Sequence, residues 1–139
     1  MLKKFSFFLF LFVSITSCKK NANSTVPLTP VDITIYVNSP SYVNVSVVGG
    51  WAYITGGARG IIIYRKSTTE FNAYDRNCTY QSSSACAKVF VDGTGIIAKD
   101  TCCGSQFSIY DGSVINPPAT LPLKMYNTSF DGTTLHIYN

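Results

Sequence analysis

The stretch AKDTCCGSQFSIYDG, residues 98–112, combines two adjacent cysteines, an alternating strand pattern and a Gly-containing turn. Polar and apolar residues alternate after Ser105, as they do in a half-buried β-strand. The two cysteines raise two alternatives, a metal or cluster loop and a pair of disulfide bonds between loops. Adjacent residues of an extended segment point to opposite faces, so Cys102 and Cys103 can each reach a different partner.

The same strand-and-turn pattern continues through the chain from residue 31 onward. Short β-rich runs alternate with turn residues, and four of them are VDITIYVN (31–38), GIIIYRKS (60–67), EFNAYDRNC (70–78) and LKMYNTSFDGTTLHIYN (123–139). Asp-Gly pairs at 92–93, 111–112 and 131–132 suit tight hairpin turns. No stretch has helical periodicity. We therefore expect an all-β domain of about eight to ten short strands.

The N-terminus reads as an export signal. Lys3 and Lys4 precede a mostly apolar run from Phe5 to Val13, which is too short for a bilayer-spanning helix. We predict a signal peptide over residues 1–17. The residues ITSC, 15–18, resemble a bacterial lipobox, which predicts lipidation of Cys18. The alternative is ordinary secretion, with Cys18 left in a discarded peptide.

A polar, proline-containing segment follows Cys18. It predicts a lipidated N-terminus and flexible tether over residues 18–30, followed by one domain over residues 31–139. Acyl chains at Cys18 would hold the protein on a membrane. No acidic cluster follows Cys18, which favours an outer-membrane lipoprotein facing the periplasm over one displayed at the cell surface.

The charge balance excludes one class of partner. Lys and Arg number 11 against 7 Asp and Glu, and two of the lysines lie in the predicted signal peptide. This balance lacks the large excess of basic residues that is typical of nucleic-acid-binding domains. Four cysteines remain after Cys18, and an even number in an exported protein predicts a disulfide framework.

Residues 47–139 resemble a Rieske iron–sulfur domain. The resemblance rests on AYDRNCTY (73–80), on DTCCGS (100–105) and on the strand, proline loop and return strand that follow in QFSIYDGSVINPPATLPLKMY (106–126). In that family two loops each give one Cys and one His to a two-iron two-sulfur cluster, and two further cysteines join the loops. The resemblance implies an antiparallel β-sandwich with a small, loop-rich subdomain that carries the cysteines.

The cluster-ligand positions of this resemblance have changed in type. Matching the motifs puts Cys78 at the first cysteine position, Tyr80 and Cys103 at the two histidine positions, and Asp100 at the second cysteine position. The chain's single histidine, His136, lies on the last predicted strand. We therefore expect a degenerate member of the family without the cluster or any other cofactor. A two-iron two-sulfur cluster with other ligands is the alternative.

The resemblance also implies the cysteine pairing. Cys86 with Cys102 follows the family's bridge between loops, and Cys78 with Cys103 would fill the vacated cluster pocket. Four thiolates around one metal ion are the alternative, but the spacing lacks the paired C-x-x-C of structural zinc sites. We predict two disulfides and no metal.

No nucleophile, general base or carboxylate pair can be assigned to a shared site, so we predict no catalytic residues. The leading hypothesis is a non-enzymatic, membrane-anchored lipoprotein with a structural or protein-binding role. The alternative is a redox protein, either a thiol–disulfide carrier using Cys78 and Cys103 or a Rieske-type electron carrier.

Overall fold

The structure, a computed structural model, describes residues 25–139. The predicted signal peptide, Cys18 and the first part of the predicted tether lie outside the described residues. Within residues 25–139, no helix has the length and apolar character needed to cross a bilayer.

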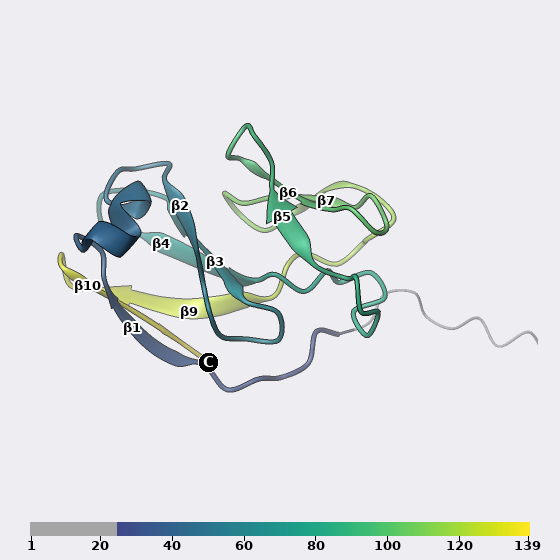
Figure 1. The fold of residues 1–139 in the computed structure, drawn as a ribbon, viewed down its shortest axis with the longest axis horizontal. Coiled ribbons are helices and arrows are strands. Elements are labelled where there is room, and N and C mark those ends of the chain that lie inside the picture. Colours follow the sequence, from purple (N-terminus) through teal and green to yellow (C-terminus); the bar gives the residue numbers. More distant parts are fainter. Residues whose placement is uncertain (1–24) are drawn as a thin grey trace, which may run out of the picture.

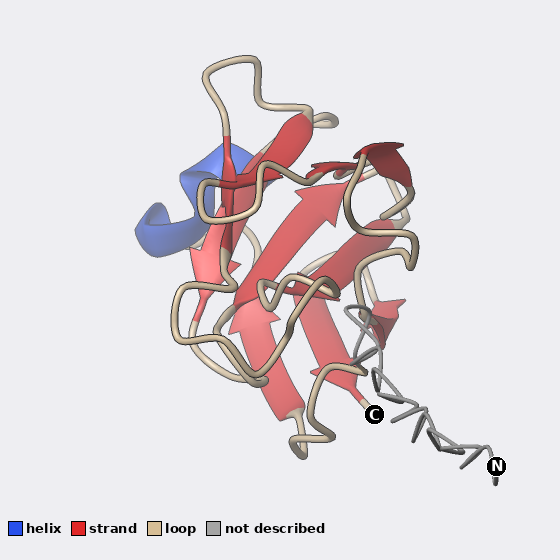
Figure 2. Cartoon of the chain, turned by 90° about the vertical axis from the view of Figure 1, so that its right-hand side faces the viewer, coloured by secondary structure: helices blue, strands red, loops and turns tan. Residues whose placement is uncertain are grey.

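The described residues form two antiparallel sheets (Figures 1 and 2). The elements are β1 (Asp32–Tyr36), η1 (Pro40–Val45), β2 (Trp51–Ile54), β3 (Ile61–Arg65), β4 (Phe71–Asp75), β5 (Val89–Val91), β6 (Ile97–Asp100), β7 (Gln106–Ser108), β8 (Val114–Asn116), β9 (Met125–Phe130) and β10 (Thr134–Tyr138). The large sheet has six strands in the order β1-β10-β9-β4-β3-β2, and the small sheet has four in the order β5-β6-β7-β8. The predicted all-β architecture with a small cysteine-bearing subdomain is confirmed.

Strand β3 explains how the two sheets share a core. Ile61 and Ile63 pack into one apolar cluster with β1, β10 and η1, whereas Ile62 and Tyr64 pack into a second cluster with the small sheet. A strand covered on both faces reads as a continuous apolar run, as the residues IIIY do. The cysteine loops pack against this second cluster, so the large sheet supports them through β3.

Strand β4 differs from its sequence prediction. Alternation suggested a half-buried strand, yet all five of its residues are buried. Phe71 and Ala73 enter the first cluster, and Tyr74 enters the second. The polar Asn72 is accommodated because its side-chain amide donates a hydrogen bond of 2.6 Å to the carbonyl of Tyr110.

The described residues also contain a short helix that the sequence did not predict. The 3₁₀ helix η1, Pro40–Val45, lies between β1 and β2 and buries Val45 in the first cluster. Six residues are too few to show helical periodicity, although Pro40 at the start is a helix-initiation signal.

The last part of the predicted tether lies along the domain. The Ser82 hydroxyl donates to the carbonyl of Thr25 (3.1 Å), and the Lys124 ammonium donates to that of Pro27 (3.1 Å). The Asn139 amide donates to the carbonyl of Thr29 (2.9 Å). Residues 25–30 therefore contact the domain at three points, within the segment predicted as a flexible tether.

The end of β4 is fixed by a buried carboxylate. Asp75 accepts hydrogen bonds from the backbone N–H groups of Ala58 (2.6 Å), Arg59 (3.3 Å) and Asn77 (2.8 Å), and from the Tyr126 hydroxyl (2.6 Å). Asp75 has no solvent exposure. Because a buried charge is tolerated only when it is well hydrogen-bonded, these four donors keep Asp75 in place.

The turn at residues 55–60 is shaped for this carboxylate. Gly57 has a φ of +62°, and a Cβ there would lie 2.5 Å from Asp75 Oδ2 and 2.6 Å from the Tyr126 hydroxyl. The adjacent Arg59 guanidinium donates to the carbonyls of residues 84–85. The turn thus links the end of β4 to the loop that carries the first two cysteines of the domain.

We predict that Tyr126→Phe lowers the free energy of unfolding by about 2 kcal/mol, because it removes a hydrogen bond to a buried carboxylate. Burial raises the pKa of the Tyr126 phenol and Asp75 raises it further, so the hydroxyl stays a donor at neutral pH. The measurement is urea unfolding followed by fluorescence.

Tyr36→Phe is the matched control, since Tyr36 is 65% exposed on β1. Its effect should be within about 0.5 kcal/mol of zero. Equal effects of the two substitutions would contradict the assigned role of Asp75.

Candidate functional site

Two loops of the small subdomain carry all the cysteines of the described residues. The first cysteine loop, residues 76–88, joins β4 to β5, and the second, residues 101–105, joins β6 to β7. A disulfide connects Cys86 of the first loop to Cys102 of the second, with a Cα–Cα distance of 5.9 Å. This is the bridge between loops that the resemblance implied, and both of its cysteines are exposed.

Cys78 and Cys103 are brought together but are not bonded. Both are free thiols, and their sulfur atoms lie 3.8 Å apart. The second predicted disulfide is therefore absent from the structure, since an S–S bond measures about 2.05 Å. The Cys103 thiol instead donates to the Ser105 hydroxyl oxygen at 3.1 Å.

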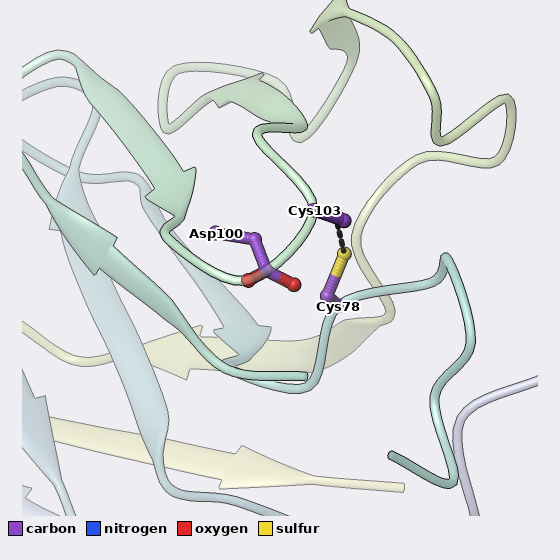
Figure 3. Close-up of side chains that lie close together, drawn as sticks. All are labelled: Cys78, Asp100 and Cys103. Atoms are coloured by element: carbon purple, nitrogen blue, oxygen red, sulfur yellow. Dashed lines mark hydrogen bonds between the residues drawn. The ribbon is translucent and has the colours of Figure 1, made fainter. Parts of the chain in front are cut away.

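The carboxylate of Asp100 faces the same two thiols (Figure 3). The two sulfur atoms and one oxygen of the Asp100 carboxylate all lie within 4.8 Å of one another. Asp100 is 1% exposed and ends β6, while Cys78 has no exposure and Cys103 is half-buried. Two sulfurs and a carboxylate therefore meet in a largely buried pocket between the loops.

Local hydrogen bonds explain why the second cysteine loop adopts this shape. The backbone N–H of Asp100 donates to the carbonyl of Ser105 (2.9 Å), and that of Gly104 donates to the carbonyl of Asp100 (2.8 Å). Gly104 has a φ of +83°, a conformation that favours glycine. Ser105 Oγ also accepts from the N–H of Ala119 at 2.9 Å, which ties the loop to the proline-containing segment.

The pocket keeps Cys78 protonated. Burial raises the pKa of the Cys78 thiol well above its ordinary value, and the Asp100 carboxylate and Cys103 raise it further. The backbone N–H of Tyr80 acts in the opposite direction. Cys78 is therefore a neutral thiol at physiological pH while the pocket holds no cation.

The other two residues considered at sequence level lie in different surroundings. The Tyr80 side chain is half-buried and packs against the second apolar cluster. His136 lies on β10 in the large sheet, where its Nε2 is 2.7 Å from Asp32 Oδ1. No imidazole is therefore placed beside the thiols, because His136 is the only histidine in the chain.

These residues do not fit a Rieske cluster. Such a cluster inserts two irons and two sulfides between the loops, with two histidines on one iron. Here the sulfurs of Cys78 and Cys103 are in contact at 3.8 Å, with the Asp100 carboxylate beside them. The three side chains could hold a single metal ion, but they lack the nitrogen ligands of such a cluster.

For two residues of the site, the sequence indicated the position but not the contacts. Ser105 was matched only as part of a Gly-Ser pair, although its hydroxyl is the partner of the Cys103 thiol. Asp100 was matched to a cluster-ligand position, and its Oδ1 accepts from the N–H of Cys102 at 2.7 Å. The signal available in the sequence was an Asp and a Cys, both potential ligands, three residues apart.

No protein-family profile matches the chain, and no curated protein matches it. Among solved structures, the ferredoxin of carbazole 1,9a-dioxygenase from Nocardioides aromaticivorans is similar, with 15% identity, a TM-score of 0.49, and coverage of 80% of this chain and 98% of that one. A ferredoxin of Sphingomonas yanoikuyae has 18% identity, a TM-score of 0.46, and coverage of 69% and 93%. A complex of oxygenase and ferredoxin in carbazole 1,9a-dioxygenase matches with 22% identity, a TM-score of 0.43, and coverage of 66% and 82%.

We predict that replacing both Cys86 and Cys102 by alanine lowers the free energy of unfolding by about 3 kcal/mol, the value expected for a disulfide that closes a loop of this size. The two cysteines are separated by 16 positions. Denaturant unfolding under non-reducing conditions measures the difference. Adding reductant should bring the wild type down to the level of the variant, and a variant as stable as the oxidised wild type would refute the prediction.

Proposed function

We propose that this protein is an exported lipoprotein, anchored to a membrane through Cys18, whose Rieske-like domain holds no iron–sulfur cluster. In this proposal the domain has a structural or protein-binding role at the periplasmic face of the outer membrane. The observation that carries it is the composition of the pocket: at the four former ligand positions stand Cys78, Tyr80, Asp100 and Cys103, and the single histidine is on another sheet.

A thiol–disulfide carrier is the second candidate, favoured by the 3.8 Å distance between two free thiols. Exchange requires a thiolate that a partner can reach. Cys78 has no solvent exposure and its pKa is raised by burial, so it is a poor nucleophile. Cys103 is half-buried, and its sulfur is directed toward Ser105. The surroundings of the pair therefore favour a structural domain over a carrier.

For the anchor, we predict that Cys18→Ser moves the protein from the membrane fraction to the soluble fraction of a native host. The sequence ITSC after the apolar run is the basis, since lipid attachment requires the cysteine thiol. Immunoblotting of fractionated cells gives the measurement.

Ser17→Ala is a matched control, because a small residue remains before the cysteine. That variant should stay in the membrane fraction. A wild-type protein that is already soluble would rule out the anchor.

For the cluster, we predict that protein purified without oxygen is colourless and lacks the visible absorption and low-temperature spin signal of a Rieske centre. The physical reason is that Tyr80 and Cys103 occupy the histidine positions. Iron and acid-labile sulfide assays provide the measurement, and stoichiometric amounts of both would overturn the proposal in favour of electron transfer.

A further inference from the structure

The Asp100 carboxylate contains a buried oxygen with no partner. Asp100 is 1% exposed, and its Oδ1 accepts from the N–H of Cys102 at 2.7 Å. Its Oδ2 is buried and has no hydrogen-bond partner among the described residues. Buried carboxylate oxygens are nearly always hydrogen-bonded or bound to a cation, because an unpaired one loses its hydration without compensation. In Figure 3 the carboxylate points toward Cys78.

The separation of the two thiols matches a tetrahedral metal site. Zinc–sulfur bonds of about 2.3 Å at a tetrahedral angle place two sulfurs about 3.8 Å apart. The sulfurs of Cys78 and Cys103 lie 3.8 Å apart. The pair would have to approach by almost 2 Å to form a disulfide, but it needs no such movement to bind one ion.

We propose that Cys78, Cys103 and Asp100 form a mononuclear site for a thiophilic divalent cation, with Zn²⁺ as the ion best suited to it. Two thiolates select against Mg²⁺ and Ca²⁺, which prefer all-oxygen ligands, and a third ligand from a carboxylate is common for Zn²⁺. The three protein ligands leave one tetrahedral position for water or another ligand from outside. This site goes beyond the proposed function and requires no iron or sulfide.

Binding at this site balances its protons simply. The two thiols release their protons to solvent as the Zn²⁺–sulfur bonds form, and the carboxylate oxygen that has no partner becomes a ligand of the ion. The half-buried side of Cys103 provides access from solvent.

The surrounding structure holds the three ligands in position. Cys78 belongs to the first cysteine loop, Asp100 ends β6, and Cys103 belongs to the second loop. The disulfide between Cys86 and Cys102 joins those two loops. Ser105 contacts Cys103 through its hydroxyl at 3.1 Å and its N–H at 3.5 Å, contacts that orient a metal-binding sulfur.

Cobalt(II) is the probe for this site, because thiolate-bound Co²⁺ absorbs in the near ultraviolet and tetrahedral Co²⁺ absorbs in the visible. The full chain, extracted from membranes and kept anaerobic without reductant, is titrated with Co²⁺. We expect one Co²⁺ per chain with both absorptions, and stoichiometric Zn²⁺ should abolish them. X-ray absorption of the zinc form should show two sulfur ligands at about 2.3 Å.

Matched variants assign the ligands. Cys78→Ser and Cys103→Ser should each lose the charge-transfer absorption, and Asp100→Asn should weaken Co²⁺ binding by about tenfold or more. Asp111→Asn should leave Co²⁺ binding unchanged, since Asp111 is exposed and lies outside the site. Circular dichroism establishes that each variant is folded.

Three outcomes would overturn the site: no charge-transfer absorption in the wild type, absorption that persists in Cys78→Ser, or a Cys78–Cys103 disulfide in protein isolated without oxidant. None of these would affect the proposal of a cluster-free lipoprotein. Stoichiometric iron with acid-labile sulfide would overturn both, so the two failures are distinguishable.

Discussion

The position of the first cysteine loop depends on the hydrogen bonds that the buried Asp75 carboxylate accepts. It stands at the end of β4, the strand from which the first cysteine loop departs, and it receives donors from the 55–60 turn, from Asn77 and from Tyr126 on β9. Without it, the start of that loop would lose its attachment to the large sheet. These hydrogen bonds also help to position Cys78, because it lies only three residues after Asp75 in the chain.

Sequence patterning predicted where the strands lie, but not how completely each strand is buried. In β1, Ile35 is buried while Tyr36 is exposed, as alternation predicts. β4 is covered on both faces, because the small sheet packs on one side and the curved large sheet encloses the other. Its polar residues Asn72 and Asp75 are buried as well. Tertiary packing, which no local pattern contains, determines their burial.

The sequence could predict which residues of the site are neighbours, but not which contacts their side chains make. Matching the loops to a Rieske domain identified Cys78, Asp100 and Cys103 as neighbours in space, and the structure brings them together. Motif matching could not show where each side chain points. The direction of the Cys103 sulfur depends on the Ser105 hydroxyl, and the free oxygen of Asp100 depends on the N–H of Cys102 occupying the other one. Both side-chain rotamers therefore depend on hydrogen bonds within the second cysteine loop.

The docking of residues 25–30 along the domain limits how the protein can face a lipid surface. Thr25 lies beside Ser82 in the first cysteine loop. Seven residues of chain lead from Cys18 to Thr25, and even fully extended they span no more than about 25 Å. With a lipid at Cys18, the domain would stay close to the headgroups and turn its cysteine-bearing end toward them. With the same anchor, a longer free tether would let the domain tumble, whereas this arrangement would favour one orientation.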